Sequence, residues 1–290
     1  SYFKKIIILY YFYLKNMLTN YSENEKEFFK KIIIDFDTRI DGREKLTMRN
    51  YEITEDVIPS CFSSLRLKLI DYDKEILITI KGELLKENNK TQENSNLTNE
   101  SIILNIDSIN KIEDIKLKQQ IEENIRNLIL RKLDQNLFFL KDNKGEITNY
   151  NWKLYIDVLI FDSVKITYLQ IISLGVKKAL LNLKLPNLIF FKNEITGIIE
   201  YDLAENYENE EVMAKEINID FQNKIPDLYI FSLINNVAYL DPNDEEEVNS
   251  NSIIIASKLN GKIENIESIG SSVELNKIME VSNTIKNLVE

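Results

Sequence analysis

Arginine is the residue type in this sequence best suited to bind an anion, because its planar guanidinium group donates paired hydrogen bonds to phosphate or carboxylate oxygens. No arginine occurs from Lys132 to the end of the chain. The arginines are Arg39, Arg43, Arg49, Arg66, Arg126 and Arg131. A site that binds phosphate through arginines would therefore have to be built from the first half of the chain.

The absence of histidine excludes Ser-His-Asp and Cys-His nucleophilic sites, imidazole-bound zinc and histidine proton transfer. A single cysteine, Cys61, excludes an internal disulfide and any Cys-x-x-Cys motif, which fits a reducing compartment. The seven glycines are too scattered for a P-loop or a dinucleotide-binding turn. P-loop nucleotide hydrolysis and Rossmann-type hydride transfer are thus excluded.

Size and charge narrow the class of protein further. The 290 residues, 44% of them hydrophobic, are enough for one large or two small domains with a buried core. Thirty-six basic against 47 acidic side chains give a net charge of -11. Since this charge disfavours attraction of the whole molecule to nucleic acid or anionic lipid, any RNA contact must be local.

Several charged residues have simple structural interpretations. Asp41, Gly42 and Arg43 are predicted to form a turn with an internal ion pair. Arg66 and Lys68 alternate with leucines and face outward from a predicted strand, where they either contact RNA or form an ordinary solvated face. Asp157 is predicted to lie on a solvated or subunit-facing side of its strand, and Asp162 in a turn.

The elements that position these residues in the first half follow from hydrophobic periodicity. Residues 64–69 and 75–80 predict a hairpin, residues 87–101 a solvated loop, and residues 102–106 a strand. A helix is predicted from Ile115, followed by strands at 136–140 and 152–161. The apolar positions from Tyr168 to Leu180 predict a second helix, with a capping box of Thr167 and Gln170, and a strand follows at 187–192.

The second half repeats this theme. Residues 201–213 are predicted to form a boundary loop, and strands follow near 217–221, 228–234, 238–240 and 252–257. Residues 241–244 are predicted to form a turn, and the acidic run 245–247 is interpreted as a solvated strand entrance rather than a metal site. A helix over 273–289 is expected to close the core of this half or, alternatively, to bind a partner.

These patterns predict an α+β protein built from two related halves, residues 17–200 and 201–290. Residues 1–16 contain a short apolar run that is too short to span a membrane and lacks a cleavage pattern. They are interpreted as an extension outside the fold.

Five signatures, which occur along the chain in the order and spacing of the family, resemble the ribonuclease PH family. The first two are residues 39–43 followed by Arg49, and the hairpin at residues 63–69. The others are the helical residues 22–29, the strand 152–159 with its following helix, and Leu240-Asp241-Pro242 with Glu245 and Glu246. The resemblance implies a fold of two β-α repeats, each with a mixed sheet packed on helices. It also implies a ring of six such domains, topped by RNA-binding cap subunits.

The resemblance also defines where this sequence departs from active members, which cleave the 3′ end of RNA with inorganic phosphate. Their phosphate-binding Gly-x-Arg type segment should follow the central strand, but residues 162–167 contain neither glycine nor arginine, and only Lys165 supplies a positive charge. Their pair of active-site acids resembles Asn235 and Asp241 here, so one acid is replaced by an amide. Asp241 is thus only a degenerate catalytic candidate, and its alternative role is that of a turn residue.

The resemblance and these departures together predict a non-catalytic ring subunit of the RNA exosome, with a structural role in 3′ to 5′ RNA processing and degradation. Its implied partners are the other ring and cap subunits, with RNA reached through the assembled complex and no membrane. No cofactor or metal is implied, and the expected location is the nucleus and nucleolus, and also the cytoplasm. The predicted RNA contacts are Arg66, Lys68 and Lys165. The alternatives are an active phosphorolytic 3′ to 5′ exoribonuclease and an unrelated acidic scaffold.

Overall fold

The computed structural model describes residues 21–36, 38–70, 72, 74–86, 101–109, 115–133, 138–141, 147–186, 188–192, 199–203, 221 and 223–288. The expected extension at residues 1–16, most of the loop at 87–101 and most of the strand near 217–221 lie outside these residues. Within the described residues, no helix is long and apolar enough to cross a membrane.

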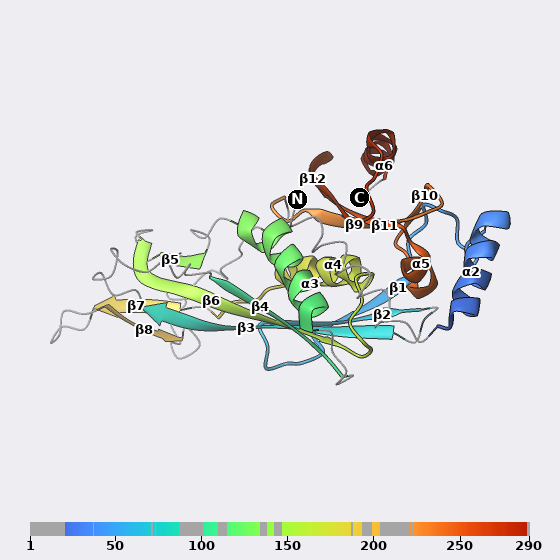
Figure 1. Cartoon of the computed structure of the whole chain (residues 1–290). Helices are drawn as coiled ribbons and strands as arrows, with labels where there is room; N and C mark the ends of the chain where they lie inside the picture. The colour runs from blue at the N-terminus through green and yellow to red at the C-terminus, as the bar shows by residue number, and fades with distance from the viewer. Residues whose placement is uncertain are drawn as a thin grey trace.

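The first sheet contains six strands in the order β1-β2-β3-β6-β4, with β5 paired to β6 (Figure 1). Its strands are β1 (Tyr51–Glu55), β2 (Ser63–Leu69), β3 (Lys74–Lys86), β4 (Ile102–Ser108), β5 (Phe139–Lys141) and β6 (Ile147–Ile160). The pairing of β4 with β6 is parallel, and the other pairings are antiparallel. The predicted hairpin is confirmed as β2 and β3, with the leucines of β2 buried and Arg66 and Lys68 exposed.

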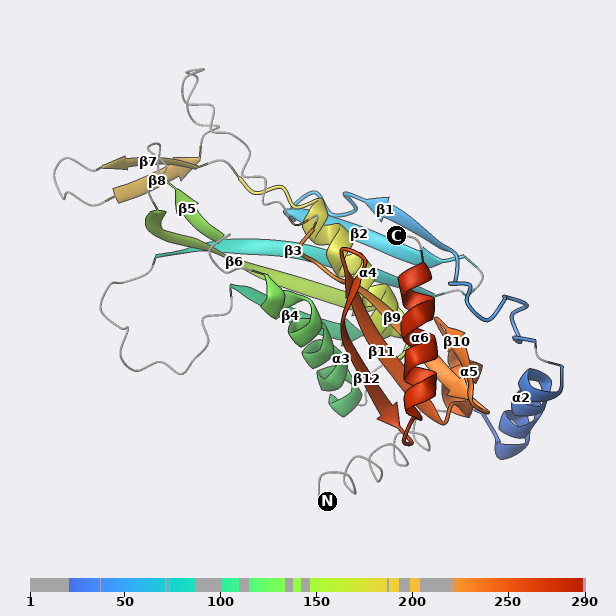
Figure 2. The same cartoon turned by 90° about the horizontal axis from the view of Figure 1, so that it is seen from above.

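The second sheet contains β9 (Asp227–Ile234), β10 (Val237–Leu240), β11 (Ser252–Leu259) and β12 (Lys262–Gly270), in the order β10-β9-β11-β12. All three of its pairings are antiparallel, so the expectation of a mixed sheet in each half is correct only for the first. The physical reason is that direct turns join β9 to β10 and β11 to β12, and such short turns reverse the chain. A separate pair of strands, β7 (Leu188–Lys192) and β8 (Ile199–Leu203), extends beyond the first sheet (Figure 2).

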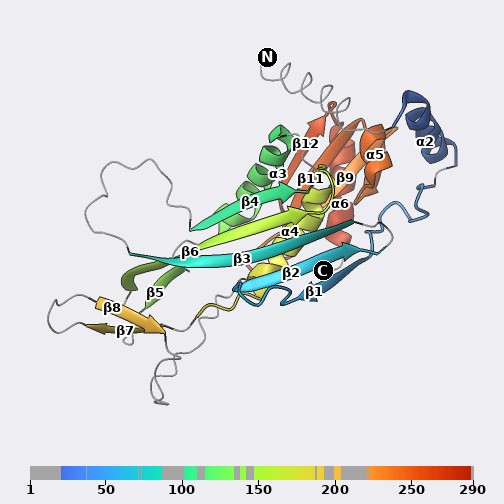
Figure 3. The ribbon, with the colours of Figure 1, turned by 90° about the horizontal axis from the view of Figure 1, so that it is seen from below.

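The helices pack against both sheets and contribute to the hydrophobic core. Both α3 (Ile115–Leu128) and α4 (Tyr168–Leu181) are confirmed, and α4 lies between the sheets, as Figure 3 also shows. A single hydrophobic core contains residues of α4 and of both sheets, which joins the halves. The predicted C-terminal helix, α6 (Leu275–Asn287), buries Val281 and Ile285 against the outer face of the second sheet.

Two further helices, one from each half of the sequence, lie side by side. The first, α2 (Glu23–Asp35), begins at a capping box made by Ser22 and Glu25. It packs beside α5 (Asp244–Asn249), which begins at a capping box made by Asn243 and Glu246. The acidic run 245–247 is therefore helical, and its interpretation as a solvated strand entrance is wrong.

Two other local predictions differ from the structure. The capping box expected at α4 does not form, because the Thr167 side chain makes no capping bond and Gln170 Oε1 instead accepts a hydrogen bond from Ile230 N–H at 2.8 Å. Gln170 thus connects α4 to the second sheet. Residues 201–203, expected to begin a loop, continue β8, because they pair with residues 188–190 of β7.

Close packing of α4 on the first sheet depends on Gly175. A Cβ added there would lie 2.4 Å from Ile78 Cδ1, which is shorter than real carbon contacts. We expect Gly175→Ala to lower the free energy of unfolding by about 1–3 kcal/mol, because the extra methyl overpacks the core. Urea denaturation measures this loss.

The double variant Gly175→Ala/Ile78→Val provides the control, because it removes the methyl group that the new Cβ would meet. We expect the alanine to cost less in the Ile78→Val background than in the parent. An equal cost in both backgrounds would contradict the proposed contact.

Candidate functional site

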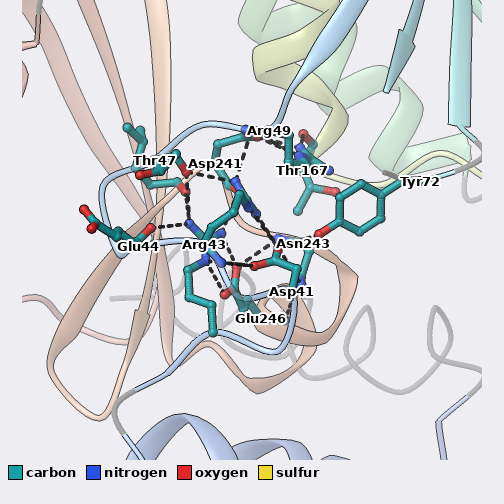
Figure 4. A network of polar contacts seen from close by, with 12 residues as sticks. Asp41, Arg43, Glu44, Thr47, Arg49, Tyr72, Thr167, Asp241, Asn243 and Glu246 are labelled. Atoms are coloured by element: carbon teal, nitrogen blue, oxygen red, sulfur yellow. Dashed lines mark hydrogen bonds and ion pairs between the residues drawn. The ribbon is translucent and has the colours of Figure 1, made fainter. Parts of the chain in front are cut away.

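The degenerate catalytic candidate, Asp241, is held by a buried ion pair. It follows β10 in a left-handed turn conformation, with φ 49°. Its carboxylate accepts hydrogen bonds from Arg49 Nη2 at 2.6 Å, from Arg49 Nε at 3.1 Å and from Arg49 backbone N–H at 2.7 Å (Figure 4). Only 3% of Asp241 and 4% of Arg49 is exposed. The Arg49 guanidinium group therefore provides the closest contacts of this carboxylate, and Arg43 Nη1 lies 3.7 Å from its Oδ2.

A second buried ion pair joins Arg39 to Glu246 of α5. The distance from Arg39 Nη2 to Glu246 Oε2 is 2.6 Å, the distance from Nε to Oε1 is 2.7 Å, and neither side chain is exposed. Arg39 also donates hydrogen bonds to the carbonyl oxygens of Leu240 and Asp241, at 2.9 and 3.0 Å. This bidentate pair fixes the segment before β1 against the end of β10.

The predicted turn and ion pair at residues 41–43 are confirmed. Gly42 has φ 77°, and Arg43 Nη2 lies 2.8 Å from Asp41 Oδ2. The Tyr72 hydroxyl donates a short hydrogen bond to the same carboxylate. Burial alone would raise the pKa of Asp41, but its bonds with Arg43 and Tyr72 lower that pKa to about 2.

Lys165, the expected remaining charge of a phosphate site, is already paired. Its ammonium group forms a short ion pair with Asp244 of α5, and Lys74 Nζ lies 2.6 Å from the same Asp244 Oδ2 atom. Burial acts to raise the pKa of Asp244, but the two lysines outweigh it and lower that pKa. Lys74 Nζ also lies 3.8 Å from Asp162 Oδ2, so two carboxylates, Asp162 and Asp244, balance the two lysines.

The side chain of Glu247, a residue of α5, lies at the N-terminus of α4. One of its carboxyl oxygens accepts a hydrogen bond from Thr167 N–H at 3.3 Å. Burial, together with the neighbouring Asp244 carboxylate, raises the pKa of Glu247 to about 7. The backbone donor that would otherwise be available to an anion at this helix end is therefore used by the chain itself.

The structure does not assemble the other predicted site residues into one place. Arg66 is paired with Glu75, and both Arg66 and Lys68 project from the face of β2 opposite to its buried leucines. Lys165 lies in the connection before α4. No finding tests RNA contact by these three residues, which stays a prediction.

The predicted acid pair is separated in the structure. Asn235 lies exposed in the turn between β9 and β10, with φ 47°, and Asp241 lies buried at the opposite end of β10. The four residues of β10, about 13 Å at ~3.3 Å per residue, separate the two positions. They do not form one catalytic pair.

The remaining acids have structural partners. Asp157 accepts a hydrogen bond from Asn105 on the neighbouring strand β4, at 3.0 Å. Asp162 lies in the bend after β6, where it accepts bonds from Ser163 N–H and from the Tyr168 hydroxyl. Among the residues that the structure describes, no group of three or more acidic or cysteine side chains is arranged to hold a metal ion.

Sequence reasoning missed the pairing of Arg39 with Glu246. The capping pattern Asn243-x-x-Glu246 does indicate that a helix begins there. No local pattern indicates the partner of Glu246, because Arg39 lies 207 residues away in the sequence.

The buried pair should be essential for stability. We expect Glu246→Gln to lower the free energy of unfolding by about 3 kcal/mol or more, because it leaves the Arg39 charge buried without a counterion. Urea denaturation of the full chain measures the loss.

The matched control is Glu245→Gln on the same helix, where the carboxylate accepts a bond from the Tyr21 hydroxyl at 2.8 Å. We expect that variant to lose less than about 1 kcal/mol. Equal losses for the two variants would show that the ion pair with Arg39 has no special weight.

Comparisons with known proteins give a fold but no sequence family. No protein-family model matches the chain, and no curated protein sequence matches it significantly. Among solved structures, a chain of an archaeal exosome core matches with a TM-score of 0.59 and 17% identity, over 90% of this chain and 93% of that one.

Two further structures give the same result. A chain of the Archaeoglobus fulgidus exosome with RNA bound to the active site matches with a TM-score of 0.60 and 18% identity, over 90% of this chain and 93% of that one. Rice (Oryza sativa) Rrp46 matches with a TM-score of 0.50 and 13% identity, over 86% of this chain and 96% of that one. The chain therefore has the α+β, ribonuclease PH-like fold of exosome core subunits.

Proposed function

We propose that this chain is a non-catalytic ring subunit of an RNA exosome, of the ribosomal RNA-processing protein 42 type. The five sequence signatures support membership of the ribonuclease PH family, and the fold is that of exosome core subunits. Its role is structural: it completes the ring and helps to form the channel through which RNA reaches a nuclease elsewhere in the assembly. It acts in 3′ to 5′ RNA processing and degradation.

The observation that carries the non-catalytic assignment is internal neutralisation of the positive groups around the start of α4. Phosphorolysis brings an anionic phosphate against an anionic diester, so its site needs positive charge that is free to bind them. Here Arg49 is paired with Asp241, and Lys74 and Lys165 share Asp244. A phosphate ion at this place would have to displace carboxylates that are part of the fold.

The proposed partners are the other ring and cap subunits, and RNA is met through the assembled complex. Strands β1 and β4 end the order of the first sheet, and β10 and β12 end that of the second, so each leaves one side unpaired by the described strands. Strand edges and apolar side chains are the usual means by which such subunits associate. Arg66 and Lys68 are the proposed RNA contacts on the outer face of β2. The proposed location is the nucleus and nucleolus, and also the cytoplasm.

An assay of phosphate-dependent RNA cleavage tests the absence of catalysis. We expect the purified full chain to release no nucleoside diphosphates from a single-stranded RNA in the presence of inorganic phosphate. Any trace activity should be the same in Lys165→Ala, because a contaminating nuclease does not depend on that lysine. Release that disappears in a folded Lys165→Ala variant would favour the alternative, an active phosphorolytic exoribonuclease.

The ring role is tested by the assembly isolated through this chain. We expect native mass spectrometry to find a single copy of the chain together with several different ribonuclease PH-like subunits, because a non-catalytic member needs other subunits to complete the ring. A stable homohexamer, or a monomer that ignores both RNA and other subunits, would contradict the proposal.

A further inference from the structure

Two carboxylates of α5 lie against the start of α4, and neighbouring basic groups compensate their negative charges unequally. Asp244 and Glu247 are three residues apart on a helix and therefore share one face. Asp244 is paired with two ammonium groups, those of Lys74 and Lys165. Among the described residues, no lysine or arginine lies within ion-pair distance of Glu247, whose carboxyl group accepts hydrogen bonds from Thr167.

The second oxygen of Asp244 gives an independent indication of a missing proton. Both lysines bind Oδ2, whereas Oδ1 is buried and accepts no hydrogen bond. Two carboxylates in one partly buried place do not both ionise at low cost, because each raises the energy of the other charge. A proton on Glu247 removes that repulsion and supplies a donor on the same face as the open oxygen.

Charged groups face this pair from every element packed around it. They are Lys74 of β3, Asp162 and Lys165 of the connection before α4, and Arg49 before β1, and two titratable hydroxyl groups, Tyr168 of α4 and Tyr21 before α2, also face Asp244. Arg49 forms an ion pair with Asp241, and Asp162 accepts a hydrogen bond from the Tyr168 hydroxyl. Lys165 attracts the Glu247 carboxylate and acts to lower its pKa, but burial and the Asp244 charge outweigh that attraction.

We propose that Asp244 and Glu247 together bind one proton, and that this proton holds α5 on the N-terminus of α4. Loss of the proton weakens the contact of α5, in the second half of the chain, with the N-terminus of α4, in the first half. This device is independent of the proposed ring function, since it concerns contacts within one chain.

The pH range follows from the carboxyl environment. Burial, with the Asp244 charge, raises the pKa of Glu247 from its ordinary 4.5 to about 7 in the folded chain. A group whose pKa is raised by folding contributes its full stability below the unfolded pKa and loses it as the pH rises through the folded pKa. The contact between α5 and α4 should therefore weaken between about pH 5 and 8.

Amide hydrogen exchange at Thr167 and in the first turn of α4 tests the proposal on the full chain. After correction for intrinsic exchange rates, we expect the opening constant of the parent protein to rise by about 10- to 100-fold between pH 5 and 8. In Glu247→Gln it should not change over this range. The amide permanently imitates a protonated carboxyl, with an oxygen for Thr167 N–H and a donor for Asp244. The control Glu27→Gln, on the exposed side of α2, should behave as the parent does.

Two results would overturn the proposal: an opening constant in the parent that does not change with pH, or the same change in Glu247→Gln. If Glu247→Gln does not fold, a carbon-13 NMR titration of the glutamate carboxyl groups in the parent decides. The proposal requires one glutamate with a midpoint near 7, and it fails if all of them titrate near 4.5.

Discussion

Folding of this chain depends on three carboxylates, those of Asp241, Asp244 and Glu246, which meet basic groups from the first half of the sequence. A charge removed from water is costly unless it meets an opposite charge with good hydrogen-bond geometry. Arg39 and Arg49 provide this geometry through their forked guanidinium groups, and the lysines that bind Asp244 provide it through point charges. The α5 helix therefore connects the two halves of the chain through ion pairs, and α4 connects the two sheets through apolar packing.

The same charges decide what chemistry the chain can perform. A catalytic site for phosphate and RNA needs basic groups that stay free in the folded protein, and here they are bound by internal acids before any ligand arrives. Asn235 and Asp241 are not brought together either, since they lie at opposite ends of β10. These contacts are the grounds for the proposed role in assembly rather than in catalysis.

Much of the fold is predictable from the sequence because local periodicity reports burial. Alternation at residues 65–69 predicts the outward position of Arg66, and the spacing of apolar residues after Tyr168 predicts α4. Local patterns fail where a distant group competes for a side chain. Gln170 binds the backbone of β9 rather than capping its own helix, and Glu246 meets an arginine 207 residues away. An acidic run is solvated or buried according to such partners, which spacing alone does not specify.

The most direct test of the account is a double-variant cycle on Arg49 and Asp241, with Arg49→Met, Asp241→Asn and their combination measured by urea denaturation of the full chain. If the two side chains serve each other in the fold, removal of the second should cost far less once the first is gone, with a coupling of about 2–3 kcal/mol. Losses that add to within about 0.5 kcal/mol would mean that Asp241 is not held for folding, and the catalytic interpretation of that carboxylate would have to be restored.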